Sequence, residues 1–175
     1  GDWSNMRIVD LRSDTVTKPT PEMRAAMASA VVGDDVFEDD PTVIQLEEKV
    51  AKLFGVEASL FVASGTMGNQ GCLHTHARPG DELICDDEAH IDWYEVGAPA
   101  ALSGLQVRPI PAPGGIPDPA RIKAAIRPEN IHHPKTSIIA MENTHLRSGG
   151  VVVPLDVIKQ VVAVAAANGI KSHLD

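Results

Sequence analysis

The chain has 175 residues, 43% of them apolar, and a formal net charge of −9 at pH 7. This length and composition predict one domain with a substantial core and argue against wholesale disorder. The negative charge, which no basic patch offsets, argues against nucleic acid as a partner. No apolar run has the length of a membrane span and the N-terminus lacks a signal-peptide pattern, so we expect no membrane association and a cytoplasmic location.

The first sixty residues contain two predicted helices joined by an acidic segment. Residues 1–5 have no periodicity, and we interpret them as an extension outside the fold. Pro21 opens the first helix, and Pro41 opens a second one that ends at Gly55. Several residues of the first helix repeat at helical spacing and are expected in the core: Met23, Ala26, Met27 and Ala30. The acidic run 33–40 is typical of a solvated loop, and its spacing does not match a calcium site.

The stretch 59–69 predicts an anion site. Residues 59–63 form an apolar run that we expect to be a strand, and the sequence Ser-Gly-Thr at 64–66 precedes a predicted helix. A strand, a glycine turn and a helix start would present free N–H groups and the positive end of a helix dipole to one point. The alternative is a plain tight connection, in which Gly65 relieves strain and Ser64 or Thr66 caps the helix. Neither a P-loop nor a dinucleotide fingerprint is present.

The remaining chain alternates between predicted strands and helices. Strands are expected over residues 83–85, 105–110, 137–141 and 170–174, and helices over 95–103, 118–126 and 154–167. This alternation predicts an α/β fold, a mostly parallel sheet flanked by helices. Ligands of such sheets bind at the carboxyl ends of the strands. Four polar segments would meet at that edge: 64–66, 86–90, 142–145 and 173–175.

The two cysteines, Cys72 and Cys85, are expected in a helix and a strand as buried, reduced thiols. Their spacing does not match a metal site, and we predict no bound metal.

Seven segments, in order from residue 10 to the last residue, resemble the low-specificity threonine aldolases of the β-eliminating lyase group. They include Ser-Gly-Thr-Met-Gly-Asn at 64–69 and Glu-Asn-Thr-His at 142–145; the others are 10–17, 32–36, 89–91, 130–132 and 172–175. The resemblance implies the aspartate-aminotransferase fold, that of fold-type I enzymes, with pyridoxal 5'-phosphate as cofactor. It also implies a homotetramer built as a dimer of dimers. Phe37 stands where the family usually has tyrosine, so a hydroxyl role at that position is not expected.

The resemblance assigns the cofactor contacts to four residues. Gly65 and Thr66 would hold the cofactor phosphate through backbone N–H groups and a hydroxyl. His90 would lie against the face of the pyridine ring and is a candidate for proton transfer at the substrate hydroxyl. Asp175 would bind the ring nitrogen and keep it protonated.

Two more residues are assigned to an amino-acid substrate. Ser13 corresponds to a family residue that helps to bind the substrate carboxylate. His132 corresponds to a position near the substrate side chain and is a second candidate for deprotonating the β-hydroxyl, a task that suits imidazole. The neighbouring His133 is expected only to line the loop.

The implied reaction is retro-aldol cleavage of L-threonine, L-allo-threonine and related β-hydroxy-α-amino acids to glycine and an aldehyde. None of the seven lysines lies in the family's cofactor-lysine motif. We therefore expect residues 6–175 to be the N-terminal segment and an incomplete large domain of a longer chain. Alternatives are another β-eliminating lyase, an aldolase for bulkier substrates, a non-catalytic fragment, or an unrelated domain that binds a phosphate ligand.

Overall fold

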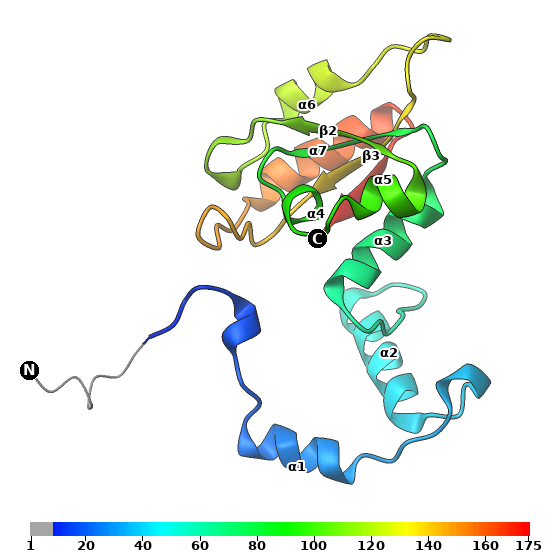
Figure 1. Cartoon of the computed structure of the whole chain (residues 1–175), viewed down its shortest axis with the longest axis vertical. Coiled ribbons are helices and arrows are strands. Elements are labelled where there is room, and N and C mark those ends of the chain that lie inside the picture. The colour runs from blue at the N-terminus through cyan, green and yellow to red at the C-terminus, as the bar shows by residue number, and fades with distance from the viewer. Residues whose placement is uncertain (1–8) are drawn as a thin grey trace, which may run out of the picture. The chain divides into compact units, whose positions relative to one another are not determined.

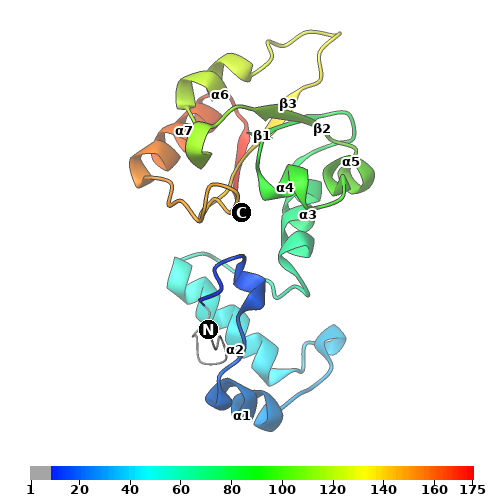
Figure 2. The same ribbon diagram turned by 60° about the vertical axis from the view of Figure 1, so that its left-hand side comes forward.

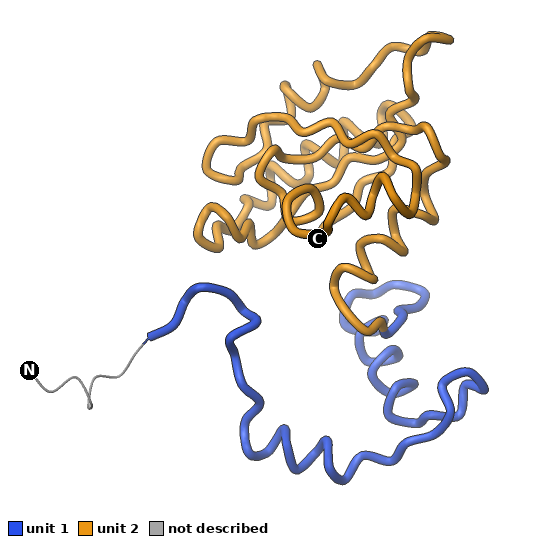
Figure 3. The backbone as a smooth tube through the Cα atoms, in the orientation of Figure 1, with its two compact units in different colours: residues 1–61 blue, residues 62–175 orange. Residues whose placement is uncertain are grey.

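The computed structural model describes residues 9–175 and divides the chain into two compact units. Unit 1 is Gly1–Phe61 and unit 2 is Val62–Asp175 (Figure 3). The predicted extension 1–5 lies outside the described residues. Over residues 9–175, the longest and most apolar helices still fall short of what a bilayer crossing requires.

Unit 1 contains short helical elements whose ends match the sequence signals. They are the 3₁₀ turns η1 (Asp14–Val16) and η2 (Asp35–Phe37) and the helices α1 (Pro21–Ser29) and α2 (Pro41–Phe54) (Figure 1). Thr20 caps α1 by accepting the N–H of Met23 at 3.2 Å. Gly55 ends α2 with φ at +65°, a left-handed conformation that glycine adopts without strain. Both predicted helix starts are confirmed.

The prediction that the apolar residues of α1 lie in a core is wrong within this unit. Met23 and Met27 are 56% and 61% exposed, because no other element of unit 1 covers the apolar side of α1. Within residues 9–61, the buried residues are Asp40 and Ala51. Asp40 also departs from the expected solvated loop: its carboxylate accepts the N–H groups of Gly33, Thr42 and Val43, and these bonds lower its pKa.

Unit 2 has the predicted α/β fold. Its helices are α3 (Gly65–His76), α4 (His90–Trp93), α5 (Ala98–Ser103), α6 (Pro119–Ala125) and α7 (Leu155–Ala167), with a 3₁₀ turn η3 (Pro113–Gly115). Its strands are β1 (Glu82–Asp86), β2 (Gln106–Ile110), β3 (Thr136–Met141) and β4 (Lys171–Leu174). All neighbouring strands are parallel, in the order β2-β1-β3-β4. The carboxyl ends of the strands therefore share one edge of the sheet.

Alternation along the central strands builds a core on each face of the sheet. Leu83 and Cys85 of β1 pack with residues of α3 and α4, whereas Ile84 packs with α6 and α7. Strand β3 divides in the same way, with Ile138 facing α3 and Ile139 facing α7. Figure 2 shows α3, α4 and α5 on one side of the sheet and α6 and α7 on the other. Runs that are apolar on both faces are typical of buried parallel strands.

Three predictions about unit 2 and its border are wrong. Residues 59–63 form no strand, because their polar groups bond to helix α2 instead of a ladder: Ser59 Oγ donates to the Glu47 carbonyl and Phe61 N–H to its carboxylate. The helix expected from residue 95 begins at Ala98, with Pro99 in its first turn. Cys72 is exposed, whereas Cys85 is buried as expected, and burial raises the pKa of its thiol.

Candidate active site

The carboxyl edge of the sheet collects polar groups from four segments of unit 2. They come from the first turns of α3, the loop and short helix after β1, the end of β3 and the end of β4. Three of the four segments predicted for this edge do follow strands, at 86–90, 142–145 and 173–175. The fourth, 64–66, follows an irregular segment and reaches the edge as the start of a helix.

His90 is held at the start of α4 by its backbone and by its ring. Its N–H donates to Glu142 Oε2 at 2.7 Å, and its Nδ1 lies 3.1 Å from Glu95 Oε1. Asp175 Oδ2 is 4.0 Å from the same nitrogen, and the side chain of His90 is 34% exposed. The structure thus brings together His90 and Asp175, two of the residues predicted to contact the cofactor.

Glu95 is the most buried member of this group, with a side chain that is 0% exposed. Its Oε1 accepts Asn69 Nδ2 at 2.7 Å, and its Oε2 accepts Gln70 Nε2 at 2.5 Å. The other end of the Asn69 amide lies 2.9 Å from His173 Nε2. Burial lowers the pKa of His173, which favours the neutral ring and a single proton on Nε2, donated to Asn69. One turn of α3 is thereby joined to the α4–α5 connection and to β4.

Ligand atoms of His90, Glu95 and Asp175 all lie within 4.8 Å of one another, a grouping that a divalent cation could use. The hydrogen bonds already explain why these three side chains lie together, because both oxygens of Glu95 accept from amide donors.

The N-terminus of α3 has the features of an anion site. Ser64 caps the helix by accepting Met67 N–H at 3.1 Å. The N–H groups of Gly65 and Thr66 have no acceptor among the described residues, as expected for the first turn of a helix. Gly65 is exposed and Thr66 is partly buried. The predicted phosphate contacts are therefore available to a ligand.

The Glu-Asn-Thr-His segment that follows β3 is a framework for the edge. Glu142 accepts the N–H of His90 through Oε2 and that of Leu146 through Oε1, both at 2.7 Å. Asn143 Oδ1 accepts the N–H of Val153 at 3.0 Å. These side chains bind backbone groups of neighbouring loops, so they position the edge.

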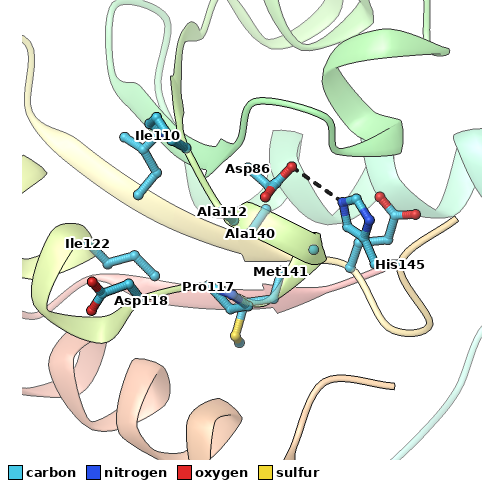
Figure 4. A pocket seen from close by; sticks show the side chains of 12 residues that line it. Asp86, Ile110, Ala112, Pro117, Asp118, Ile122, Ala140, Met141 and His145 are labelled. Carbon is cyan, nitrogen blue, oxygen red and sulfur yellow. Dashed lines mark hydrogen bonds and ion pairs between the residues drawn. The ribbon is translucent and has the colours of Figure 1, made fainter. Parts of the chain in front are cut away.

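His145 completes this framework by pairing with Asp86 at the end of β1 (Figure 4). Its Nδ1 accepts the N–H of Ser148 at 3.2 Å, so the neutral ring carries its proton on Nε2, which lies 3.3 Å from Asp86 Oδ1. Burial is the main cause that raises the pKa of Asp86. Gly115 lies against the other side of this imidazole, where an added Cβ would lie 2.5 Å from the ring.

Two predicted site residues lie elsewhere. His132 is in the loop between α6 and β3, where its N–H donates to Asn130 Oδ1 at 2.9 Å. Because that loop enters β3 at its amino end, the structure does not bring His132 to His90 within one chain. Ser13 belongs to unit 1, where its Oγ accepts the N–H of Thr15 at 3.3 Å. The substrate roles of both residues stay predictions.

Sequence reasoning missed Glu95, Gln70 and the role of His173. Glu95 stands at the border of an alanine-rich segment, where a glutamate is expected to face solvent. The available signal was Gly97 two residues later, since a break in the helix there leaves residue 95 outside the regular pattern. Gln70 carries no comparable signal.

Comparison with known proteins agrees with this architecture. The model of the beta-eliminating lyase family matches residues 10–175. The chain belongs to the beta-eliminating lyase family. The predicted family resemblance is confirmed, and so is the predicted fold: a solved structure of Leishmania major threonine aldolase superposes with a TM-score of 0.82 over 94% of this chain and 48% of that one, at 22% identity.

Two curated relatives are similar over nearly the whole chain. A probable low-specificity L-threonine aldolase 2 of Arabidopsis thaliana is 44% identical over 98% of this chain and 50% of its own length. The low specificity L-threonine aldolase of Escherichia coli K12 is 38% identical over 96% of this chain and 50% of its own. The chain therefore spans about half the length of these relatives.

Proposed function

We propose that the complete protein carrying this chain is a pyridoxal phosphate-dependent lyase that cleaves L-threonine, L-allo-threonine and related β-hydroxy-α-amino acids into glycine and an aldehyde. The supporting observation is the group at the carboxyl edge: His90 with Nδ1 3.1 Å from Glu95 and 4.0 Å from Asp175. The similarity to chains named low-specificity threonine aldolases supports the substrate class.

The residues of this edge fit pyridoxal phosphate. The two N–H groups at Gly65 and Thr66, with the Thr66 hydroxyl, suit a phosphate, because unpaired helix-start donors favour an anion. The side chain of Asp175 has no hydrogen-bond donor among the described residues and is 27% exposed, so its carboxylate is available to a ring nitrogen. The bound cofactor would supply an electron sink that stabilises negative charge at the substrate Cα.

The proposed task of His90 is proton transfer at the β-hydroxyl. Its Nε2 takes the hydroxyl proton, so the O–H bond breaks as the N–H bond forms. The oxygen electron pair becomes the C=O bond of the aldehyde, and the Cα–Cβ pair stays on Cα. One proton delivered to Cα, equal to the one that His90 took and later releases, completes glycine, so atoms and charge balance over the cycle.

Assembly, location and the remaining contacts belong to the same proposal. We propose a homotetramer in the cytoplasm, with Ser13 at the substrate carboxylate and His132 near the substrate side chain. Since His132 lies at the amino end of β3, a role for it requires a second subunit or a rearranged loop.

The test is product analysis of the complete protein loaded with pyridoxal phosphate. Threonine should yield glycine and acetaldehyde in equal amounts, and allo-threonine and phenylserine should yield glycine with their own aldehydes. His90→Asn should lower kcat by about 10²–10⁴-fold, the usual contribution of a positioned acid-base group, while the cofactor stays bound. Release of ammonia and a 2-oxo acid with the full carbon chain, 2-oxobutanoate from threonine, instead of glycine would establish the alternative lyase. Unchanged turnover in His90→Asn would remove this residue from the mechanism.

A further inference from the structure

Glu95 is the hydrogen-bond partner of the His90 ring. An ionised carboxylate only accepts hydrogen bonds, and Oε1 of Glu95 lies 3.1 Å from His90 Nδ1. The Nδ1 atom must therefore be the donor. The lone pair of the neutral ring is then on Nε2, which has no hydrogen-bond partner among residues 9–175.

The surroundings of Glu95 support the ionised form. Asn69 Nδ2 and Gln70 Nε2 both point at its oxygens, at 2.7 and 2.5 Å. The Asn69 amide fits both neighbours in one orientation, with its nitrogen toward Glu95 and its oxygen 2.9 Å from His173 Nε2. Within the described chain the ion-pair partner of this buried carboxylate is His90, and no arginine or lysine reaches it. A negative charge with amide donors and one imidazole interacts most favourably with a positive ring.

We propose that Glu95 is a positioning residue for proton transfer: it holds His90 with the proton on Nδ1, leaves Nε2 to accept the β-hydroxyl proton, and stabilises the ring after that proton arrives. This inference rests on the proposed function and names a residue that acts through His90. The carboxylate that orients the histidine of a Ser-His-Asp triad acts by the same physics.

The unpaired amide oxygen of Gln70 makes Glu95→Gln an informative substitution. Gln70 Oε1 is buried and has no partner among the described residues. If Gln70 turns its amide over, that oxygen accepts from the nitrogen of a glutamine at position 95, while the glutamine oxygen still faces Asn69 and His90. Glu95→Gln therefore keeps the hydrogen bonds and removes mainly the charge.

The experiment is a double-mutant cycle on the complete, cofactor-loaded protein. Glu95→Gln should lower kcat for threonine about 10–100-fold, the cost found for carboxylates that orient metal-binding histidines, with KM changed less. In the His90→Asn background the same substitution should change kcat less than about twofold, because coupled residues are not additive. Equal losses in both backgrounds, or unchanged kcat in Glu95→Gln, would overturn the proposal.

A second readout separates positioning from structural damage. Exchange of the glycine α-proton in D₂O needs the cofactor site but no β-hydroxyl, so Glu95→Gln should keep exchange within about threefold while cleavage falls. Loss of both to the same extent would contradict the proposal. Glu88→Gln is the matched control, because it removes a charge from the same edge where the side chain pairs with Arg147 at 3.3 Å and does not bond to His90. Its kcat should be unchanged.

Should Glu95→Gln fail to fold, Glu95→Asp gives the same cycle with the charge retained. Its loss of kcat must again disappear in the His90→Asn background, and an undiminished loss there would overturn the proposal. Wild-type protein that binds pyridoxal phosphate without forming glycine from threonine would instead refute the proposed function itself, which separates the two failures.

Discussion

The two edges of the sheet in unit 2 each contain a buried glutamate, and their partners differ. Glu82 begins β1 at the amino edge, where its carboxylate lies 2.7 Å from Arg127 Nε and 3.6 Å from Arg108 NH1. Glu95, near the carboxyl edge, has two amides and an imidazole as partners. Both side chains are 0% exposed.

The difference shows which buried charge is structural. Guanidinium groups stay protonated at any physiological pH, so the charge of Glu82 is compensated permanently. An imidazole gains and loses a proton near neutral pH, so the compensation of Glu95 changes during a proton transfer at His90. The glutamate at the amino edge therefore stabilises the fold, whereas the glutamate near the carboxyl edge has a partner whose charge changes when His90 gains or loses a proton.

The largest expected effect on stability concerns the amino edge. Glu82→Ala should lower the free energy of unfolding by about 3–4 kcal/mol, because Arg127 and Thr136 lose a fully buried charged acceptor and two half-buried guanidinium groups lose their countercharge. Urea unfolding of the complete protein measures this, and kcat per folded molecule should not change. Glu129→Ala, on an exposed loop, should stay within about 0.5 kcal/mol of wild type. A loss below about 1 kcal/mol for Glu82→Ala would remove the structural distinction between the edges.

A smaller effect is expected where the carboxyl edge is packed most tightly. Gly115→Ala should cost about 2–3 kcal/mol, because its Cβ would lie 2.5 Å from the His145 ring at a φ of +72°. Gly114→Ala is the matched control, with φ at +71° and no atom within 4 Å of the added Cβ; it should cost about 1 kcal/mol from backbone strain alone. Equal costs at the two positions would mean that the imidazole moves freely.

The smallest expected effect is a pH dependence. His173 has a lowered pKa in the folded state, so below about pH 6.5 the unfolded chain binds more protons than the folded one, and stability falls as the pH decreases. His173→Gln keeps a donor for Asn69 and removes this proton uptake. Its unfolding free energy should therefore decline by up to about 1 kcal/mol less than that of wild type between pH 7 and pH 5. Parallel declines in the two proteins would show that His173 is not held neutral by burial.

Local patterns predicted the parts of the fold that depend on local physics. Proline and glycine signals at Pro21, Pro41 and Gly55 placed helix ends, and the two-faced apolar runs of β1 and β3 placed the central strands. The short run 59–63 has the same apolar character and is not a strand. A ladder needs a neighbouring strand, and a single segment does not reveal whether one exists.

The site was predictable where its residues follow strands. Asp175 comes directly after β4 and His90 four residues after β1, and parallel strands bring such residues to one edge. Glu95 was not predictable, because its partners Asn69 and Gln70 lie 26 and 25 positions earlier, on helix α3, which packs on the same face of the sheet as α4. Burial of a charge is a tertiary property, and it is visible only after α3 and α4 are packed together.

The two hydrogen bonds of the Glu142 carboxylate affect how a mutational scan of this protein should be interpreted. It accepts the N–H of His90 and that of Leu146, so one side chain holds both the start of α4 and the loop after β3. A screen scored by product formation would rank position 142 beside His90, although its carboxylate is occupied by two backbone donors. Loss of activity on mutation of the Glu-Asn-Thr-His segment would thus reflect misplacement of the backbone at His90, which lies fifty-two positions before Glu142.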